Sequence, residues 1–153
     1  MTFLTALTVM TPTTSARQTA FQVLRDIDRK DSYVDLALDR ILQKSDLQQS
    51  DRRLVTELVY GVIRRQRTLD HLIEQFSQKN NPKQPPDLRR ILQIGLYQLR
   101  YLDQIPASAA VNTSVDLAKT NGLKGLAGVV NGILRSYLRI QANQGDLIAF
   151  PIG

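Results

Sequence analysis

Apolar side chains recur along most of this chain at intervals of three and four residues, the spacing that keeps them on one face of an α-helix. The first run shows the pattern in Ala16, Ala20, Val23 and Ile27. Further runs follow, and together they predict helices over residues 16–27, 34–42, 50–63, 69–76, 86–102, 111–118 and 126–138. No stretch alternates with the period of two that marks a half-buried strand. The pattern therefore predicts an all-α fold.

Local signals predict where several of these helices begin and end. Ser15 and Thr68 stand just ahead of apolar runs and are typical N-cap residues. Pro86 suits the first turn of a helix, where the missing N–H of proline would have no partner in any case. Asn121 and Gly122 follow an apolar run and are residue types that favour a helix end. These signals agree with the boundaries that the apolar runs predict.

The same reading divides the chain into one domain and two flanking tails. Residues 15–139 carry the helical pattern and are predicted to form the domain. Residues 78–86 contain three prolines and are predicted to be an internal loop. Residues 1–14 are predicted to be a disordered tail, within which Met10 is an alternative start. Residues 140–153 have no helical period and are predicted to be a C-terminal tail or the beginning of a linker.

Four glycines fall inside the helical runs, where each costs about 1 kcal/mol relative to alanine. Gly61 and Gly95 are isolated, whereas Gly128 and Gly132 are one helical turn apart. Because a glycine lets a neighbouring backbone or side chain approach closely, we expect close helix–helix contacts at all four positions. The pair in the last run predicts a flat contact face.

Composition limits the chemistry that this chain can perform. Its 153 residues include no cysteine and a single histidine, His71. Disulfides, cysteine-ligated zinc, iron–sulfur clusters and a cysteine nucleophile are therefore excluded, as is a histidine-rich metal site. No apolar stretch reaches the roughly 20 residues that a transmembrane helix needs. The composition favours a cytoplasmic protein without membrane contact.

Positive charge is concentrated in the middle of the chain. The formal net charge is +6, and residues 52–103 alone carry +5, whereas residues 1–51 carry −1. Eight of the ten basic residues in this middle segment are arginines, which bind phosphate with two N–H groups and stack on bases. Its clusters are Arg52-Arg53, Arg64-Arg65, Arg67 and Arg89-Arg90.

Arg64, Arg65 and Arg67 directly follow the third apolar run, and two interpretations are open. They could be solvated cations that stabilise the C-terminal end of a helix. They could also contact the phosphate backbone of a nucleic acid, in which case binding would weaken as the salt concentration rises. The residue pattern by itself supports both interpretations equally.

Polar residues in helical segments supply further candidates. Asn112 and Asn131 lie among apolar residues. Each is either a buried amide that bonds the backbone, which we favour, or an amide edge that recognises a base. Arg17 and Gln18 open the first helix. There they either reinforce an anion site at the free N–H groups or are ordinary exposed residues of the first turn.

Four longer segments carry a family resemblance. They are SYVDLALDRIL, SDRRLVTELVYGVIRRQRTLDHLI, LRRILQIGLYQLRYLDQIPASAAVNTSVDLAK and GLAGVVNGILRSYLR. From about Ala16 to Arg139 the chain resembles the NusB-like domain. Within that family it is most similar to the N-terminal domain of bacterial small-subunit rRNA cytosine-5 methyltransferases. Free-standing antitermination factors share the fold but fit the middle helices less well.

The resemblance implies an all-α, NusB-like fold of two small helical bundles packed together, with RNA binding as the activity. The basic first helix of the family falls on Arg17, Gln18 and Arg25, although antitermination factors carry more arginines there. The late helices of the family contribute secondary RNA-binding candidates, which stand beside the arginine cluster. These are Asn112, Lys119, Asn131 and Arg135, beside Arg64, Arg65 and Arg67.

The resemblance also implies that RNA binding and methyl transfer belong to different domains. Methyl transfer in that family needs a cysteine thiolate and S-adenosylmethionine bound to an α/β domain, and this sequence has neither a cysteine nor an α/β pattern. We therefore expect no catalysis, cofactor or metal in this chain. Its expected role is to dock small-subunit rRNA for a methyltransferase domain. The alternatives are a free-standing regulator of transcription antitermination, with a small ribosomal protein as partner, and a purely structural helical scaffold.

Overall fold

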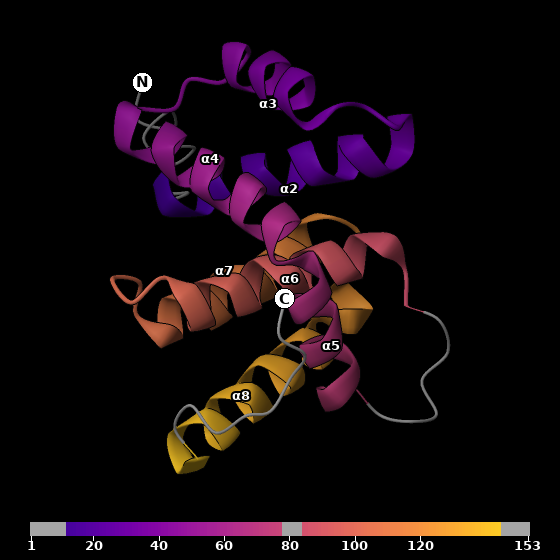
Figure 1. The fold of residues 1–153 in the computed structure, drawn as a ribbon, viewed down its shortest axis with the longest axis vertical. Coiled ribbons are helices and arrows are strands. Elements are labelled where there is room, and N and C mark those ends of the chain that lie inside the picture. The colour runs from indigo at the N-terminus through magenta and orange to yellow at the C-terminus, as the bar shows by residue number, and fades with distance from the viewer. Residues whose placement is uncertain (1–11, 78–83, 145–153) are drawn as a thin grey trace, which may run out of the picture. The chain divides into compact units, whose positions relative to one another are not determined.

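The structure is a computed structural model that describes residues 12–77 and 84–144. Within these ranges it consists of helices and short connections, without a strand, as the apolar pattern predicts. Figure 1 shows α2 (Pro12–Lys30), α3 (Val34–Gln43), α4 (Gln49–Arg64), α5 (Gln66–Phe76), α6 (Pro86–Tyr101), α7 (Ala107–Thr120) and α8 (Ala127–Gln144). A short 3-10 helix, η1 (Lys124–Leu126), precedes α8. The chain divides into two compact units, unit 1 over residues 1–60 and unit 2 over residues 61–153.

Two predicted N-caps are wrong, because both helices begin earlier than their apolar runs. α2 begins at Pro12, a residue type suited to a first turn, so Ser15 lies inside the helix. The carbonyl of Ser15 accepts a hydrogen bond from the Thr19 hydroxyl at 2.8 Å. Thr68 is likewise buried inside α5, which begins at Gln66. The signals at Pro86, in the first turn of α6, and at the end of α7 are confirmed, and Gly122 there adopts a φ of 82°.

The last helix extends beyond its predicted end. α8 continues to Gln144, although the apolar run stops at residue 138 and a tail is predicted from residue 140. Backbone hydrogen bonding needs no apolar period, and the sequence offers no helix breaker before Gly145. The Gln141 side chain donates to the Tyr137 hydroxyl at 3.2 Å within this extension. The predictions for residues 1–11, 78–83 and 145–153 fall outside the described residues.

Unit 1 contains α2, α3 and most of α4. Helices α2 and α3 contact each other, and the buried side chains of this unit include Phe21 of α2 and Leu38 of α3. A polar link reinforces the contact, because the Arg40 guanidinium of α3 forms an ion pair with Asp26 of α2. The short helix α3 is therefore held by both apolar burial and charge.

Unit 2 is organised around α6, which contacts α5, α7 and α8. Every residue of α6 from Arg90 to Gln98 is buried, as expected for a helix that others surround. Gly95 permits this arrangement, because a Cβ there would lie 2.7 Å from Oγ of Ser114 and 2.8 Å from a methyl group of Leu134. The close approach predicted at Gly95 is therefore confirmed.

The flat contact face predicted on the last helix is wrong. Gly128 and Gly132 of α8 are both exposed, and apart from their chain neighbours and the adjacent helix backbone no described atom lies within 4 Å of a Cβ built at either position. Both line an open recess in unit 2 instead. In the parts of the chain that the structure describes, no helix is both long and apolar enough to cross a membrane.

Candidate nucleic-acid interface

The arginine cluster that follows the third apolar run lies where α4 ends and α5 begins. Arg64 is the last residue of α4, Arg65 forms the junction, and Arg67 belongs to the first turn of α5. The Arg65 N–H still donates to the Gly61 carbonyl at 2.9 Å, so one helix passes into the next without an intervening loop. All three side chains are exposed, which gathers three positive charges on the surface of unit 2.

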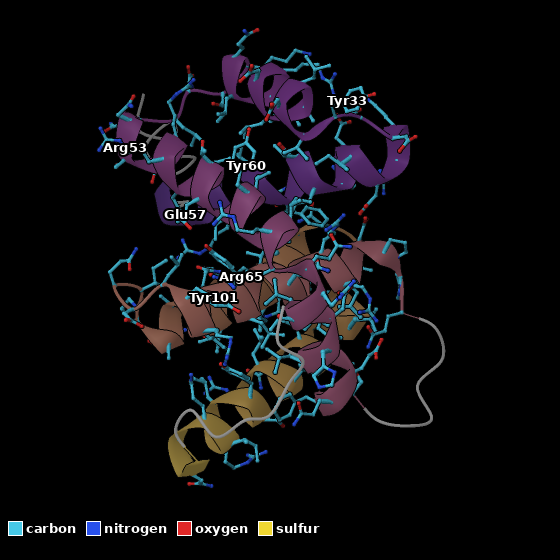
Figure 2. The ribbon with its side chains drawn as sticks, in the orientation of Figure 1. Tyr33, Arg53, Glu57, Tyr60, Arg65 and Tyr101 are labelled. Carbon is cyan, nitrogen blue, oxygen red and sulfur yellow. The ribbon has the colours of Figure 1, made fainter. Side chains whose placement is uncertain are left out.

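Arg65 differs from its two neighbours because its guanidinium lies over an aromatic ring. Its Cζ is 4.9 Å from the ring centroid of Tyr101 at the C-terminal end of α6, and Figure 2 labels both side chains. The Arg100 guanidinium is 5.6 Å from the same ring. A cation within about 6 Å of a ring centroid is attracted by the electron density on the face of the ring. Tyr101 therefore restricts the orientation of Arg65.

Tyr101 is supported in turn by Tyr97, one helical turn earlier on α6. The two ring centroids are 5.1 Å apart, with 38° between the ring planes. Tyr97 is only 4% exposed, and its ring passes so close to Gly61 that a Cβ there would lie 2.1 Å from Cζ of the ring. The contacts therefore recur one turn apart on both segments, with Gly61 beside Tyr97 and Arg65 beside Tyr101. The close approach predicted at Gly61 is confirmed.

Neither tyrosine stands out in the sequence as a candidate for binding. In the sequence, Tyr97 and Tyr101 belong to an apolar helical run, where an aromatic residue is usually part of a core. Their partners Gly61 and Arg65 are more than 30 residues earlier in the chain. The spacing of apolar residues within one helix does not show which other helix packs against it. The only available signal was the matching four-residue spacing in the two segments.

A polar recess lies beside Arg67 on α5. It has a volume of about 460 Å³ and is lined by Gln66, Arg67, Asp70, His71 and Glu74. The lining carries both signs of charge and includes the single histidine of the chain. No group of three or more histidine, cysteine, aspartate or glutamate side chains that could hold a metal ion occurs among the described residues.

Arg89 and Arg90 do not extend the exposed cluster, because both are held in polar contacts between α5 and α6. Arg89 Nη1 donates to Asp70 Oδ1 at 3.1 Å, and Gln93 Nε2 donates to the same oxygen at 2.7 Å. Arg90 is 8% exposed and donates through Nη1 to Gln66 Oε1 of α5 at 3.3 Å and to Gln93 Oε1 of its own helix at 3.0 Å. Arg90 is thus buried, and Arg89 is half-buried in an ion pair with Asp70. Of the arginine clusters in the middle segment, Arg89-Arg90 therefore adds less exposed charge than the count of charges indicated.

The three candidates on the first helix belong to unit 1 and have different surroundings. Arg17 is 1% exposed and lies beyond the first turn of α2, so the first-turn placement predicted for it and for Gln18 is wrong. Burial lowers the pKa of Arg17, and the negative charge of Asp51 acts in the opposite direction. Gln18 and Arg25 are half-buried, and Arg25 Cζ lies 5.1 Å from the ring centroid of Phe21. Their part in ligand binding stays a prediction.

The four candidates on the late helices lie in unit 2. Asn112 and Lys119 of α7 and Arg135 of α8 are exposed, so the buried amide that we favoured for Asn112 is wrong. Asn131 is half-buried, and its Oδ1 accepts a hydrogen bond from Arg135 Nε at 3.0 Å. The amide of Asn131 is thus partly engaged within α8. These residues also remain predictions as ligand contacts.

These observations define an all-α domain whose surface displays an arginine cluster, one member of which lies over one of two neighbouring tyrosine rings. The family of the domain follows from comparison with known proteins, because the NusB family model matches residues 14–139. The chain therefore belongs to the NusB family, and the resemblance found in its sequence is confirmed.

Two relatives show how the chain relates to longer and shorter members of the family. It is 71% identical over 134 residues to the probable ribosomal RNA small subunit methyltransferase B of Synechocystis sp., which covers 88% of this chain and 30% of that protein. It is 31% identical over 135 residues to the transcription antitermination protein NusB of Ruminiclostridium cellulolyticum. This match covers 87% of this chain and 89% of that protein. The chain thus spans about a third of the length of the methyltransferase relative.

A solved structure supports the fold. The complex of antitermination factors NusB and NusE with dsRNA contains a chain that matches with a TM-score of 0.73 and 21% identity, covering 82% of this chain and 95% of that chain. At this identity the match shows the shared NusB-like fold.

Proposed function

We propose that this domain binds RNA through the exposed arginines of unit 2. The observation that carries the proposal is the cluster of Arg64, Arg65 and Arg67 at the α4–α5 junction. All three are exposed, and none forms an ion pair with a carboxylate among the described residues. Exposed arginines without a carboxylate partner can bind phosphate groups and release the counterions that surround a nucleic acid.

The distribution of charge along the sequence supports the same proposal. Unit 1 contains eight basic and eight acidic residues, whereas unit 2 contains twelve basic and six acidic residues. The whole formal net charge of +6 therefore belongs to unit 2. A polyanion is attracted to the region where the charge is not compensated, so the attraction favours the unit that carries the cluster.

The relatives suggest a biological role for this binding. Because the chain is similar to part of a probable ribosomal RNA small subunit methyltransferase B, we propose that it docks small-subunit rRNA for a methyltransferase domain. Methyl transfer and S-adenosylmethionine binding are then assigned to polypeptide outside these 153 residues. The absence of cysteine from the sequence supports this assignment, because attack on a cytosine ring by a thiolate needs that residue.

The proposal is tested by measuring binding to fluorescently labelled small-subunit rRNA hairpins between about 50 and 200 mM salt. Affinity should fall steeply with salt concentration, because phosphate contacts dominate. Arg64→Gln and Arg67→Gln should each lower affinity and make the slope of log K against log salt shallower by about one. Failure to bind at low salt, or binding that does not respond to salt, would contradict the proposal.

A matched control removes the same charge from unit 1. Arg53 is exposed on α4, within unit 1, and is labelled in Figure 2. Arg53→Gln should leave both the affinity and the salt slope close to those of the unchanged chain. Circular dichroism of every variant should show the same helix content, so that a loss of binding is not a loss of fold.

A second candidate function is regulation of transcription antitermination. It is favoured by the length of the match, because the antitermination protein NusB of Ruminiclostridium cellulolyticum is covered over 89% of its length. A solved antitermination complex contains NusB together with NusE. Co-purification of this chain with a NusE-type ribosomal protein as a stable heterodimer would favour this second function over rRNA docking for methylation.

A further inference from the structure

We infer that Arg65 and Tyr101 form a stacking platform for an unpaired RNA base, an inference that rests on the RNA binding proposed above. The ligand class is a nucleotide in a loop, a bulge or a single strand. The bases of a regular duplex are stacked on one another and cannot be reached in this way. The platform adds base stacking to a surface that would otherwise contact phosphates alone.

The geometry of Arg65 carries this inference. Its guanidinium is planar and lies over the Tyr101 ring at 4.9 Å, while the side chain as a whole is exposed. Arginine planes stack on bases as aromatic rings do. Because Arg65 lies over the ring and is exposed, we expect one face of its guanidinium to be open to a base. The base would extend a series of contacts in which Tyr97 lies beside Tyr101 and Arg65 lies over Tyr101.

The support beneath the platform is built into the fold. Tyr97 is buried, and the absence of a side chain at Gly61 leaves space for its ring. Tyr97 and Tyr101 both belong to α6, the helix around which unit 2 is organised. A binding group mounted on rigid helices loses little conformational freedom when its ligand arrives. Arg65 is therefore oriented before RNA binds.

The neighbouring arginines complete a site for a whole nucleotide. Arg64 and Arg67 flank Arg65 at the helix junction, and both are exposed without an aromatic contact among the described residues. They are suited to phosphate groups, which need charge but no stacking surface. This difference within one cluster makes the inference testable, because replacing arginine by lysine keeps the charge and removes the planar group.

The test compares two probes, an RNA hairpin with an adenosine-rich loop and a duplex of the same length without a loop. Arg65→Lys should weaken binding to the looped hairpin about five- to tenfold and leave duplex binding within about twofold. The matched control Arg64→Lys should leave both within about twofold, because the charge remains. Tyr101→Leu should behave as Arg65→Lys does, whereas Tyr101→Phe retains the ring and should behave as the unchanged chain.

A spectroscopic measurement reports on the stack itself. With 2-aminopurine in the loop, its fluorescence should be quenched on binding to the unchanged chain, and this quenching should be lost with Arg65→Lys. Tyr101→Leu could lose thermal stability, whereas Arg65→Lys leaves both tyrosines in place. The result for Arg65→Lys therefore decides the test.

Two results separate this inference from the proposed function. If both RNAs bind and Arg65→Lys matches Arg64→Lys on each of them, the platform is absent and RNA binding stands. If the unchanged chain binds neither RNA at low salt, the proposed function fails, and the platform fails with it.

Discussion

Gly61 is the residue whose small size matters most for the surface of unit 2. A Cβ at this position would lie 2.1 Å from Cζ of Tyr97, which is far shorter than any real contact. Because Tyr97 is only 4% exposed, its ring has little room to move away. Its displacement would also disturb Tyr101, whose ring centroid is 5.1 Å away. The absence of a side chain at Gly61 thus leaves room for Tyr97, which lies beside Tyr101, the ring that Arg65 lies over.

Overpacking in Gly61→Ala should lower the free energy of unfolding by about 1–3 kcal/mol. The higher helix propensity of alanine offsets about 1 kcal/mol of this loss. Gly132→Ala is the matched control, because apart from its chain neighbours and the adjacent helix backbone no described atom lies within 4 Å of the new methyl group. It should keep or raise stability by up to about 1 kcal/mol. Urea unfolding followed by circular dichroism measures both variants, and equal effects would show that Tyr97 adapts freely.

Among the helices, α3 depends on an ion pair as well as on apolar contacts. Asp26 of α2 pairs with Arg40 of α3 and lies 3.1 Å from Lys30 Nζ on its own helix. Burial raises the pKa of the Asp26 carboxyl group, but the hydrogen bonds and positive charges of Lys30 and Arg40 outweigh it. The net result is a pKa below the ordinary value. The cations themselves are well exposed, which limits the energy of the cluster.

The lowered pKa of Asp26 predicts how stability responds to acid. A carboxyl group with a lower pKa in the folded chain stabilises the fold above its unfolded pKa of about 3.9. That contribution is lost as the pH falls through the folded pKa. Asp26→Asn should reduce the free energy of unfolding at pH 7 by at most about 1 kcal/mol, and the difference from the unchanged chain should shrink in acid. Thermal melts at several pH values measure this difference.

The control for this prediction is Asp46→Asn, which removes an exposed carboxylate from the connection between α3 and α4. Its melting temperature should follow that of the unchanged chain at neutral pH. A pH-independent deficit for Asp26→Asn would show that its ion pair with Arg40 adds nothing to the α2–α3 contact.

For the whole molecule, the asymmetry of charge predicts how RNA association and dissociation are divided among residues. The formal excess of +6 lies within unit 2, and electrostatic attraction between a protein and a polyanion acts mainly on the rate of encounter. Replacing both Arg64 and Arg67 by glutamine should therefore slow association. Arg65→Lys keeps the charge and should mainly speed dissociation of a looped RNA, since short-range contacts determine that rate.

Stopped-flow fluorescence with a labelled hairpin separates the two rates. The effect of the double variant on association should diminish at high salt, because screening removes the attraction. The effect of Arg65→Lys on dissociation should persist there. If both variants change only the same rate constant, charge and stacking do not act separately on this surface.

The α-helices, their order and the family membership could be predicted from the sequence alone, whereas the short helix η1 was not predicted. The apolar run from Leu88 to Leu102 predicts α6, Pro86 marks its beginning, and Gly122 marks the end of α7. Helix formation depends on residues three and four apart, so this information is local and can be read directly. The errors at Ser15, Thr68 and the end of α8 concern helix ends, where a few hydrogen bonds decide the boundary.

The binding surface required the folded chain. Nothing near Arg90 in the sequence indicates that it is buried while Arg65 is exposed, and both belong to the same positively charged segment. Likewise, the local context of Gly61 and that of Gly132 are alike, although only Gly61 faces a buried ring. These distinctions arise from contacts between residues that are distant along the chain. Helical periodicity specifies which face of a helix is covered, whereas only packing between helices specifies which side chain covers it.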